Sequence, residues 1–330
     1  MIQQRPVICK GASVCVVVAA FNAERTIARA LRSALAEPEV CEVILVDDLS
    51  CDGTIAAAQA CDDGSGRLRL LRQSSNQGPA AARNRALDES KAPNIAILDA
   101  DDMILPGRFA ALLAEEGWDA VADNIAFLRE DVFADQIPNL VRGVPGRTTL
   151  SLAAFVDGNV SRRGRPRGEM GFIKPMIRRA FLERHGLRYD ETLRLGEDYA
   201  LYARMLAKGA HFTLLRDCGY LALERAGSLS GSHRTVDLAT LLASDRNLLE
   251  MPELVRSDRA IIQRHADHIA GKLHHRQMLD IRKQKGRAAA ALAAAAKPAG
   301  LASLVATVIH DKLGKRHVSA SQGEVRYLFA

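Results

Sequence analysis

The alternation of short apolar segments with helical patterns over the first 130 residues most constrains the fold. Four apolar segments of strand length are predicted strands: 13–20, 42–46, 67–71 and 94–98. Helices are predicted between them at 27–35, at 54–60 and from Pro79 onward, with Asn22 as the cap of the first helix. Strands that alternate with helices form a parallel sheet covered by helices. The sequence therefore predicts an α/β fold with a Rossmann-like, mostly parallel sheet and helices on both faces.

Composition excludes several other classes of protein. The chain has 330 residues, of which 48% are hydrophobic and 25% charged, as in ordinary globular proteins. Its longest strongly apolar run, 14–21, is far shorter than the roughly 20 residues of a membrane-spanning helix, so no such helix is expected. The first residues lack the pattern of a secretion signal. We therefore expect a cytoplasmic protein. Because the six cysteines form no Cys-x-x-Cys pair, we expect them to be free thiols.

The charge of the chain is divided unevenly. Residues 256–330 carry 14 lysines and arginines against 5 acidic residues, a net charge of +9, which leaves −3 for residues 1–255. Ile262, Ala266, Ile269 and Leu273 recur at helical spacing with basic residues between them, which predicts an amphipathic helix. Either it packs on the main domain as a solvated helix, or it docks to anionic lipid. Nucleic-acid binding is not expected, because only 5% of residues are aromatic and no recognised motif is present.

Two acidic clusters directly follow predicted strands. Asp47 and Asp48 follow the second strand, and Asp99, Asp101 and Asp102 follow the fourth. Ligands of open α/β sheets bind beyond the carboxyl ends of the strands, so both clusters are expected at one crevice. Carboxylate oxygens suit Mg²⁺ or Mn²⁺, and such an ion normally completes its shell with water and substrate phosphates. Each cluster alone could equally be an acidic turn, but the pair predicts a metal and a phosphorylated ligand.

Four segments in this order resemble the family 2 glycosyltransferases with the GT-A fold: 17–24, 46–54, 76–84 and 98–102. A further match lies downstream at 186–191 and 196–199, so that the resemblance covers roughly residues 13–230. It implies a glycosyltransferase domain at 1–235, with a nucleotide-binding half at about 13–125 and an acceptor half at about 126–235. A basic helical region is expected at 236–330.

The resemblance also implies a role for particular residues of the nucleotide-binding half. Ala20, Phe21, Glu24 and Asp48 are expected to hold the nucleobase and ribose, with Asp47 beside them. The sequence departs from the family pattern at Phe21, where tyrosine is frequent, and at Leu49, where glycine is frequent. The second departure is expected to affect the turn after Asp48.

Four further residues complete the expected site. Arg83 is expected to help hold the nucleotide. Asp99 and Asp101 form the Asp-x-Asp motif and are the expected metal ligands, with Asp101 contacting the ion that bridges the diphosphate. Asp198 of the Glu197-Asp198 pair is expected to be the general base. A metal ion can stabilise the departing diphosphate, and a carboxylate can take the proton of the attacking hydroxyl.

These assignments imply an inverting, Mg²⁺- or Mn²⁺-dependent transfer of one sugar from a UDP-linked donor. The Gln-x-x-Arg-Trp motif of processive members is absent from the sequence, so one sugar per encounter is expected. Segments 37–40 and 62–68 resemble bacterial exopolysaccharide enzymes of the rhizobial succinoglycan type. That resemblance implies transfer of glucose from UDP-glucose to a lipid-diphosphate-linked oligosaccharide, which the basic C-terminal region could meet at the inner face of the plasma membrane.

Two further segments could contact phosphates, and the sequence also allows two other functions. The basic segment 162–167 is expected to be a solvated loop, or else a contact for phosphates. Arg225 with the segment 228–230 resembles a family segment that closes over the diphosphate. Asp99 and Asp101 also resemble the nucleophile loop of haloacid-dehalogenase-like phosphatases, but they follow the fourth strand and Met103 stands where Thr or Val is usual. A catalytically silent nucleotide-binding or scaffold protein is the remaining alternative.

Overall fold

The computed structural model describes residues 14–129, 137, 140, 142–160, 170–224, 234–295 and 325–329, with the backbone alone for 290–295. The described residues form two compact units. The first unit lies within Met1–Ser151, Met170–Ala226 and Val325–Ala330, and the second within Leu152–Glu169 and Gly227–Glu324. The boundary predicted at residue 235 remains a prediction.

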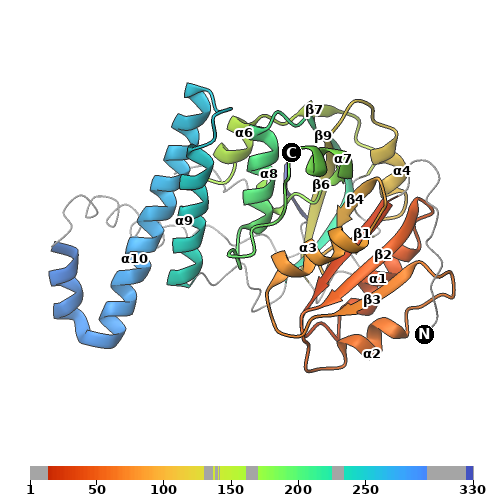
Figure 1. Ribbon diagram of the computed structural model, residues 1–330, viewed down its shortest axis with the longest axis horizontal. Helices are drawn as coiled ribbons and strands as arrows, with labels where there is room; N and C mark the ends of the chain where they lie inside the picture. The colour runs from red at the N-terminus through yellow and green to blue at the C-terminus, as the bar shows by residue number, and fades with distance from the viewer. Residues whose placement is uncertain are drawn as a thin grey trace. The chain divides into compact units, whose positions relative to one another are not determined.

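The first unit contains the sheet and the helices that cover it (Figure 1). Its strands are β1 (Val14–Ala20), β2 (Val40–Asp47), β3 (Leu68–Arg72), β4 (Asn94–Ile97), β5 (Met103–Ile104), β6 (Ala120–Arg129), β7 (Arg147–Thr149), β8 (Met176–Arg178), β9 (Phe212–Glu224) and β10 (Arg326–Tyr327). Its helices are α1 (Ile27–Leu35), α2 (Thr54–Gln59), α3 (Pro79–Glu89), α4 (Arg108–Leu113), the 3₁₀ turn η2 (Met170–Phe172), α7 (Arg179–Arg184) and α8 (Glu197–Ala207).

The strands form one mixed sheet in the order β3-β2-β1-β4-β8-β6-β9-β5, with β10 beside β6 and β7 beside β9. The four predicted strands correspond to β1 to β4, and they pair in parallel. Strand β8 runs antiparallel between β4 and β6, which the sequence did not predict. Because β1, β2 and β4 point the same way, Ala20, Asp47 and the residues after Ile97 reach the same edge of the sheet.

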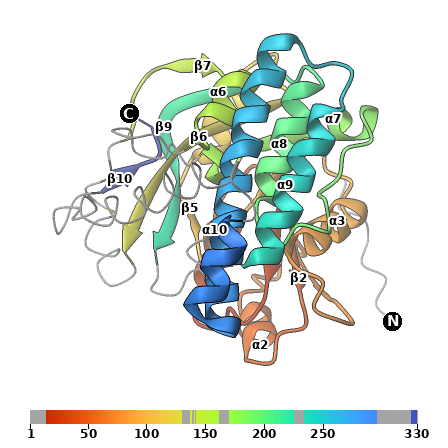
Figure 2. The same cartoon turned by 90° about the vertical axis from the view of Figure 1, so that its left-hand side faces the viewer.

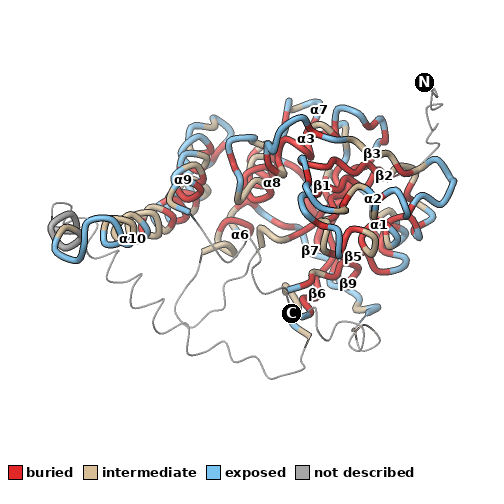
Figure 3. Tube along the Cα trace, turned by 90° about the horizontal axis from the view of Figure 1, so that it is seen from below, coloured by how far each residue is buried: buried red, intermediate tan, exposed pale blue. Residues whose placement is uncertain are grey.

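The parallel strands β1, β2 and β4 consist largely of buried residues, and buried residues are red in Figure 3. Val14 to Val18 of β1 have no exposed surface, which confirms a strand buried on both sides. The apolar stripe of α1 packs against this core. Asn22 is not the cap of α1, which begins after Thr26. Its side-chain oxygen instead accepts a hydrogen bond from the Cys51 N–H at 3.0 Å, so Asn22 joins the loops that follow β1 and β2.

The described cysteines are all free thiols: Cys15, Cys41, Cys51, Cys61 and Cys218. Cys9 lies outside the described residues. Burial raises the pKa of the Cys218 thiol to about 12, so this side chain stays protonated and packs as a small apolar group.

Leu49 has a backbone conformation that favours glycine, the residue frequent at this position in the family pattern. Its φ is 65°, in the left-handed region, and the residue is 40% exposed. Glycine removes the steric strain at this angle, whereas a β-branched residue increases it. We therefore expect Leu49→Gly to be more stable than Leu49→Val by about 1–2 kcal/mol, measured as the free energy of unfolding in urea. Equal stabilities of the two variants would contradict a strained turn.

The second unit is helical and contains α6 (Leu152–Asp157), α9 (Thr235–Leu249) and α10 (Arg256–Ala295). Helices α9 and α10 lie side by side (Figure 2). Three residues of the predicted apolar stripe, Ile262, Ala266 and Ile269, are buried, and the fourth, Leu273, is half-buried. A hydrogen bond of 2.7 Å joins the buried side chains of His265 and Asp245 across the pair of helices. The helical path of α10 is interrupted at Gly286, where φ is 84°.

Within the described ranges, no helix combines enough length with enough apolar character to cross a bilayer.

Candidate active site

The loops after β1 and β2 hold the residues expected to contact the nucleobase. Asp48 is buried, and its carboxylate accepts hydrogen bonds from the N–H groups of Gln77 and Gly78, each at 2.8 Å. These bonds tie the end of β2 to the start of α3. Asp47 is fully buried and forms an ion pair with Arg72 at 3.3 Å. Both acidic side chains therefore have ordinary structural partners at the carboxyl edge of the sheet.

Phe21 and Glu24 differ from these residues because both are exposed. Phe21, one residue beyond β1, is 51% exposed, which is unusual for a large apolar side chain next to a buried strand. The Glu24 carboxylate accepts a hydrogen bond from the Gly53 N–H at 3.0 Å. The Ala20 carbonyl accepts one from the Asp48 N–H at 2.8 Å. An aromatic face and a carboxylate are thus presented to solvent beside the ends of two parallel strands.

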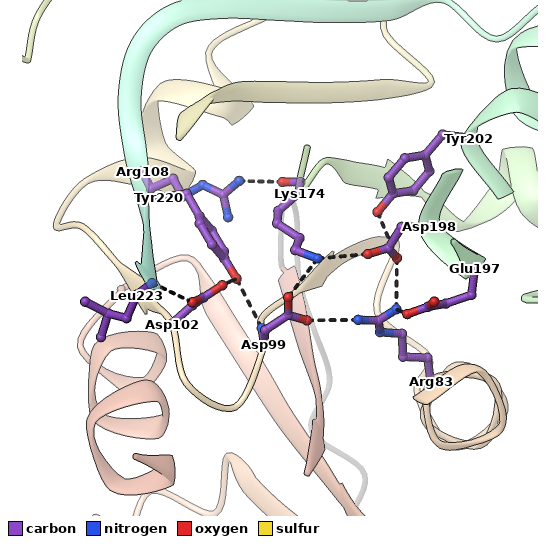
Figure 4. Close-up of polar contacts among 10 residues, drawn as sticks. All are labelled: Arg83, Asp99, Asp102, Arg108, Lys174, Glu197, Asp198, Tyr202, Tyr220 and Leu223. Carbon is purple, nitrogen blue, oxygen red and sulfur yellow. Dashed lines mark hydrogen bonds and ion pairs between the residues drawn. The ribbon is translucent and has the colours of Figure 1, made fainter. Parts of the chain in front are cut away.

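A second group of residues gathers around Arg83 of α3 (Figure 4). Arg83 is only 4% exposed, and its guanidinium contacts three carboxylates. One terminal nitrogen lies 2.8 Å from Asp99 Oδ1, and the other lies 2.8 Å from Glu197 Oε1 and 2.9 Å from Asp198 Oδ1. The Asp-x-Asp motif after β4 and the acidic pair at the start of α8 therefore meet across one guanidinium.

Lys174 is a second cation that contacts two of these carboxylates (Figure 4). Its Nζ atom lies 2.8 Å from Asp99 Oδ2 and 2.8 Å from Asp198 Oδ2. The register of the sheet explains how it arrives there. Strand β8 pairs antiparallel with β4, so that Met176 faces Ala96. Because the two strands run in opposite directions, the residues just before β8 lie near the residues just after β4, which places Lys174 beside the loop that contains Asp99.

The electrostatics of the group follow from burial and from these two cations. Burial opposes ionisation of Asp99, but the charges of Lys174 and Arg83 outweigh it and lower its pKa to about 2. Burial alone lowers the pKa of Lys174, yet the charges of Asp198 and Asp99 raise it above its usual value. Burial raises the pKa of Glu197, opposed by Arg83 and reinforced by Asp198. Asp99 and Lys174 are therefore both charged at neutral pH.

Acidic side chains at the amino end of α8 are also favoured by the helix itself. Glu197 and Asp198 occupy its first turn, where the helix dipole stabilises negative charge. Gly196 precedes them with φ 82°, a conformation that lets the chain turn sharply into the helix. The Tyr202 hydroxyl, one turn further, donates to Asp198 Oδ1 at 3.4 Å.

A supporting set of buried residues holds the loop after β4. The Tyr220 hydroxyl donates to Asp102 Oδ2 at 2.8 Å and accepts a hydrogen bond from the Asp99 N–H at 3.1 Å. The Leu223 N–H donates to Asp102 Oδ1 at 3.0 Å. Burial, together with the nearby charges of Asp99 and Asp101, raises the pKa of Asp102 well above its usual value. Asp102 thus anchors the acidic loop to β9.

Arg108 and Asp123 form a buried ion pair that contacts the backbone of Lys174. Both are buried, with Arg108 nitrogens 2.9–3.1 Å from the Asp123 carboxylate oxygens. The same guanidinium donates a hydrogen bond to the backbone carbonyl of Lys174. Gly219 of β9 packs directly on this ion pair, because a Cβ atom there would lie 2.1 Å from Asp123 Oδ2 and 2.6 Å from Arg108 Cγ.

The substitution Gly219→Ala is therefore expected to displace the buried Arg108–Asp123 pair. Overpacking of this kind costs about 1–3 kcal/mol, and the loss of buried charge contacts adds to it. Urea unfolding of the variant should show a clearly lower midpoint than that of the unsubstituted protein. An unchanged midpoint would mean that the pair can move aside without cost.

The Asp-x-Asp motif supplies carboxylate oxygens, which are the ligands that Mg²⁺ and Mn²⁺ prefer. Among the residues that the structure describes, no three histidine, cysteine or acidic side chains converge to form a complete metal site. Mg²⁺ and Mn²⁺ are normally held by one or two carboxylates together with substrate phosphates. Asp101 is half-buried, and its backbone carbonyl accepts a hydrogen bond from Arg29 at 3.2 Å. Both oxygens of Asp99 are in ion pairs, so a metal ion that binds it must approach the positive charges of Arg83 and Lys174.

The structure thus brings together three of the predicted residues, Arg83, Asp99 and Asp198, in direct contact. The expected nucleobase residues form a separate set of contacts around the ends of β1 and β2. Sequence reasoning missed Lys174, although a signal was present: it is the one charge in the otherwise apolar segment 172–177. The basic segment 162–167, Arg225 and the segment 228–230 lie outside the described residues.

Comparison with known proteins supports the family expected from the sequence. The sequence model of "Glycosyl transferase family 2" matches residues 15–183. The chain is 47% identical to the succinoglycan biosynthesis protein ExoU of Rhizobium meliloti, over 96% of this chain and 94% of that protein. It is 35% identical to the succinoglycan biosynthesis protein ExoO of the same organism, over 95% of this chain and 86% of that protein.

Solved structures share the fold at low sequence identity. The TarS fragment 1–349 of S. aureus in complex with UDP-GlcNAc has a TM-score of 0.56 and 20% identity, covering 83% of this chain and 76% of that one. The mannosyltransferase PcManGT of Pyrobaculum calidifontis, in complex with GDP-Man and Mn²⁺, has a TM-score of 0.52 and 19% identity, covering 91% and 80%. Together, the fold, the family match and the similarity along nearly the whole chain show that this protein belongs to glycosyltransferase family 2 and is a glycosyltransferase with the GT-A fold.

Proposed function

We propose that the protein transfers one sugar, with inversion, from a nucleotide sugar to a glycan acceptor during synthesis of a succinoglycan-type exopolysaccharide. The donor is UDP-glucose and the acceptor is a lipid-diphosphate-linked oligosaccharide. The observation that carries the proposal is the contact of Asp99 and Asp198 with the same Arg83 guanidinium. It joins the carboxylate expected on the donor side to the one expected on the acceptor side. The similarity to ExoU and ExoO supports the pathway.

In this proposal, Asp198 accepts the proton of the acceptor hydroxyl as that oxygen attacks the anomeric carbon of the sugar. A positioned base of this kind contributes on the order of 10²- to 10⁴-fold to the rate. Arg83 and Lys174 hold the Asp198 carboxylate on both of its oxygens, so its orientation is set before substrate arrives. One direct displacement inverts the configuration at the anomeric carbon.

The donor end of the site is assigned to the exposed loops after β1 and β2. We place the nucleobase and ribose against Ala20, Phe21, Glu24 and Asp48, with Asp47 behind them. Phe21 offers an exposed aromatic face on which a base can stack. Mg²⁺ or Mn²⁺, held by Asp101 and Asp99, would supply positive charge to the departing diphosphate.

The donor and acceptor are tested together by incubation with radiolabelled UDP-glucose, Mg²⁺ or Mn²⁺ and a membrane lipid extract. We expect label to enter the lipid fraction, with little transfer from other nucleotide sugars. Removal of the metal with EDTA should abolish transfer, and either ion should restore it. If no nucleotide sugar is consumed while simple phosphoesters release phosphate, a phosphatase is indicated instead. The place of Asp99 after the fourth strand, with Met103 where Thr or Val is usual, argues against that alternative.

We also propose that α10 binds anionic lipid headgroups, which places the enzyme at the inner face of the plasma membrane. Four basic residues on either side of the interruption at Gly286 are exposed to solvent: Arg282, Lys283, Lys285 and Arg287. Acidic neighbours are few, since Asp280 is the one carboxylate between residues 268 and 295. A Lys or Arg side chain near an anionic bilayer contributes about 1 kcal/mol, so the four together can hold a protein at such a surface.

Sedimentation with phosphatidylcholine vesicles, with and without phosphatidylglycerol, tests this surface. We expect binding only to the anionic vesicles, weakened by high salt and lost when the four basic residues of α10 are changed to Glu. A matched control changes four exposed basic residues of the first unit to Glu, namely Arg25, Lys91, Arg184 and Arg188. The role of α10 would be contradicted if both variants lost vesicle binding equally. It would also be contradicted if the protein bound neutral and anionic vesicles equally well.

A further inference from the structure

Lys174 places a positive charge between two carboxylates of the site, Asp99 and Asp198. It is 4% exposed, and its ammonium lies 2.8 Å from an oxygen of Asp99 and 2.8 Å from an oxygen of Asp198. Asp99 directs its other oxygen to Arg83 at 2.8 Å. The first carboxylate of the Asp-x-Asp motif therefore has a positive partner on each oxygen.

The charges of this group nearly balance. Asp99, Glu197 and Asp198 supply three negative charges, and Arg83 and Lys174 supply two positive ones. Without Lys174 the same group would carry a net charge of −2 in a largely buried place. Such a group attracts a divalent cation strongly, because charges inside a protein are weakly screened. Lys174 thus competes directly with any metal ion that approaches Asp99.

The lysine is also held in place by contacts that are independent of the carboxylates. Its backbone carbonyl accepts a hydrogen bond from Arg108, which is fixed by the buried Asp123. Strand β8 begins two residues later and pairs with both β4 and β6. The backbone of Lys174 is therefore fixed by Arg108 and by the neighbouring strand β8, and its ammonium reaches Asp99 from there.

We propose that Lys174 is an internal counter-ion that masks Asp99 from free divalent cations until the nucleotide is bound. The proposal rests on the proposed function, because it requires that the Asp-x-Asp motif holds a metal. A nucleoside diphosphate brings negative charges of its own, with which the ammonium can pair when it leaves Asp99. Metal and nucleotide then bind together, and the protein alone retains little metal.

Direct binding of Mn²⁺ measures this masking without reference to sugar transfer. Free Mn²⁺ is followed by electron paramagnetic resonance during titration of the full-length protein, with and without UDP. For the unsubstituted protein we expect weak binding of Mn²⁺ alone and much tighter binding with UDP. For Lys174→Met we expect binding of Mn²⁺ alone to tighten by at least about tenfold, because a positive charge beside the metal site is removed. The increase in Mn²⁺ affinity on addition of UDP should be smaller for this variant than for the unsubstituted protein.

Three further variants make the result specific. Lys174→Gln removes the charge but keeps a hydrogen-bonding group, and it should match Lys174→Met if the charge matters. Lys174→Arg keeps the charge and should restore weak binding of Mn²⁺ alone. Lys91→Met removes an exposed positive charge just before β4, at the end of that strand opposite to Asp99, and should leave Mn²⁺ affinity unchanged. Circular dichroism of each variant confirms that the protein is folded.

Two outcomes would overturn the inference, and they are distinguishable from each other. If Mn²⁺ binds the unsubstituted protein with UDP, but folded Lys174→Met and Lys174→Gln bind Mn²⁺ alone no better than it does, the lysine does not mask the site. The metal part of the proposed function then still stands. If Mn²⁺ binds neither with nor without UDP in any variant, both the metal site and the masking role are wrong.

Discussion

The Asp198→Asn variant should lose transfer almost completely while it keeps its affinity for UDP. The amide has nearly the shape of the carboxylate but cannot accept the proton of the acceptor hydroxyl. We expect the rate of transfer to fall by about 10²- to 10⁴-fold. The Kd for UDP should stay within a few-fold, because the expected nucleobase residues lie at the ends of β1 and β2, in a separate set of contacts. Label transfer from UDP-glucose and titration with UDP measure the two effects.

A surface substitution of the same kind provides the control. Asp88 has a 64% exposed side chain and pairs only loosely with Arg188, at 3.3 Å. The variant Asp88→Asn should transfer sugar at the normal rate. Since Asp198 also contacts Arg83 and Lys174, thermal unfolding must show that Asp198→Asn is folded at the assay temperature. Normal turnover in the folded Asp198 variant would refute its role as the base.

Loss of Arg83 should have the largest effect on stability. Its guanidinium contacts Asp99, Glu197 and Asp198, which come from two distant parts of the sequence. The change Arg83→Met leaves these largely buried carboxylates with Lys174 alone. Removal of one partner from a buried ion pair costs about 3–5 kcal/mol, because the remaining charge has lost both its partner and its water. We expect the free energy of unfolding in urea to fall by that amount.

The matched control removes an arginine from an exposed ion pair. Arg188 has a 43% exposed side chain, and Arg188→Met should cost less than about 1 kcal/mol, as is usual for such pairs. If Arg83→Met proves too unstable to purify, Arg83→Lys keeps one positive charge and should lose less stability. If Arg83→Met and Arg188→Met lowered the free energy of unfolding by similar amounts, the buried ion pairs of Arg83 would stabilise the protein no more than an exposed pair does.

The parallel half of the fold could be predicted from local patterns. The unbroken apolar run in β1 can be buried only between two covering layers, and the alternation with helices leaves a parallel sheet as the simple arrangement. The position of Asp47 and Asp99 after their strands then follows, because the carboxyl ends of parallel strands share an edge. The family match confirmed the class of enzyme, while the roles of individual residues stay predictions.

Lys174 shows why the rest could not be predicted. A lysine within the apolar segment 172–177 indicates a buried charge that needs a partner, but the partner is set by long-range pairing. That pairing is the antiparallel insertion of β8 between β4 and β6. A strand of three residues has too weak a local signal to reveal its neighbours. The same holds for Arg108 and Asp123, whose ion pair is recognisable only once α4 and β6 are packed.

By itself the sequence determined the parallel sheet, the acidic strand ends, the basic C-terminal region and the family. These features depend on neighbours in the chain or on motifs in a fixed order, so they can be read without coordinates. Only the tertiary structure decided how the charges are paired, with Arg83 and Lys174 enclosing Asp99 and Asp198. Pairing is a property of distances of about 3 Å between residues far apart in the sequence, and buried charges persist only where those distances are met.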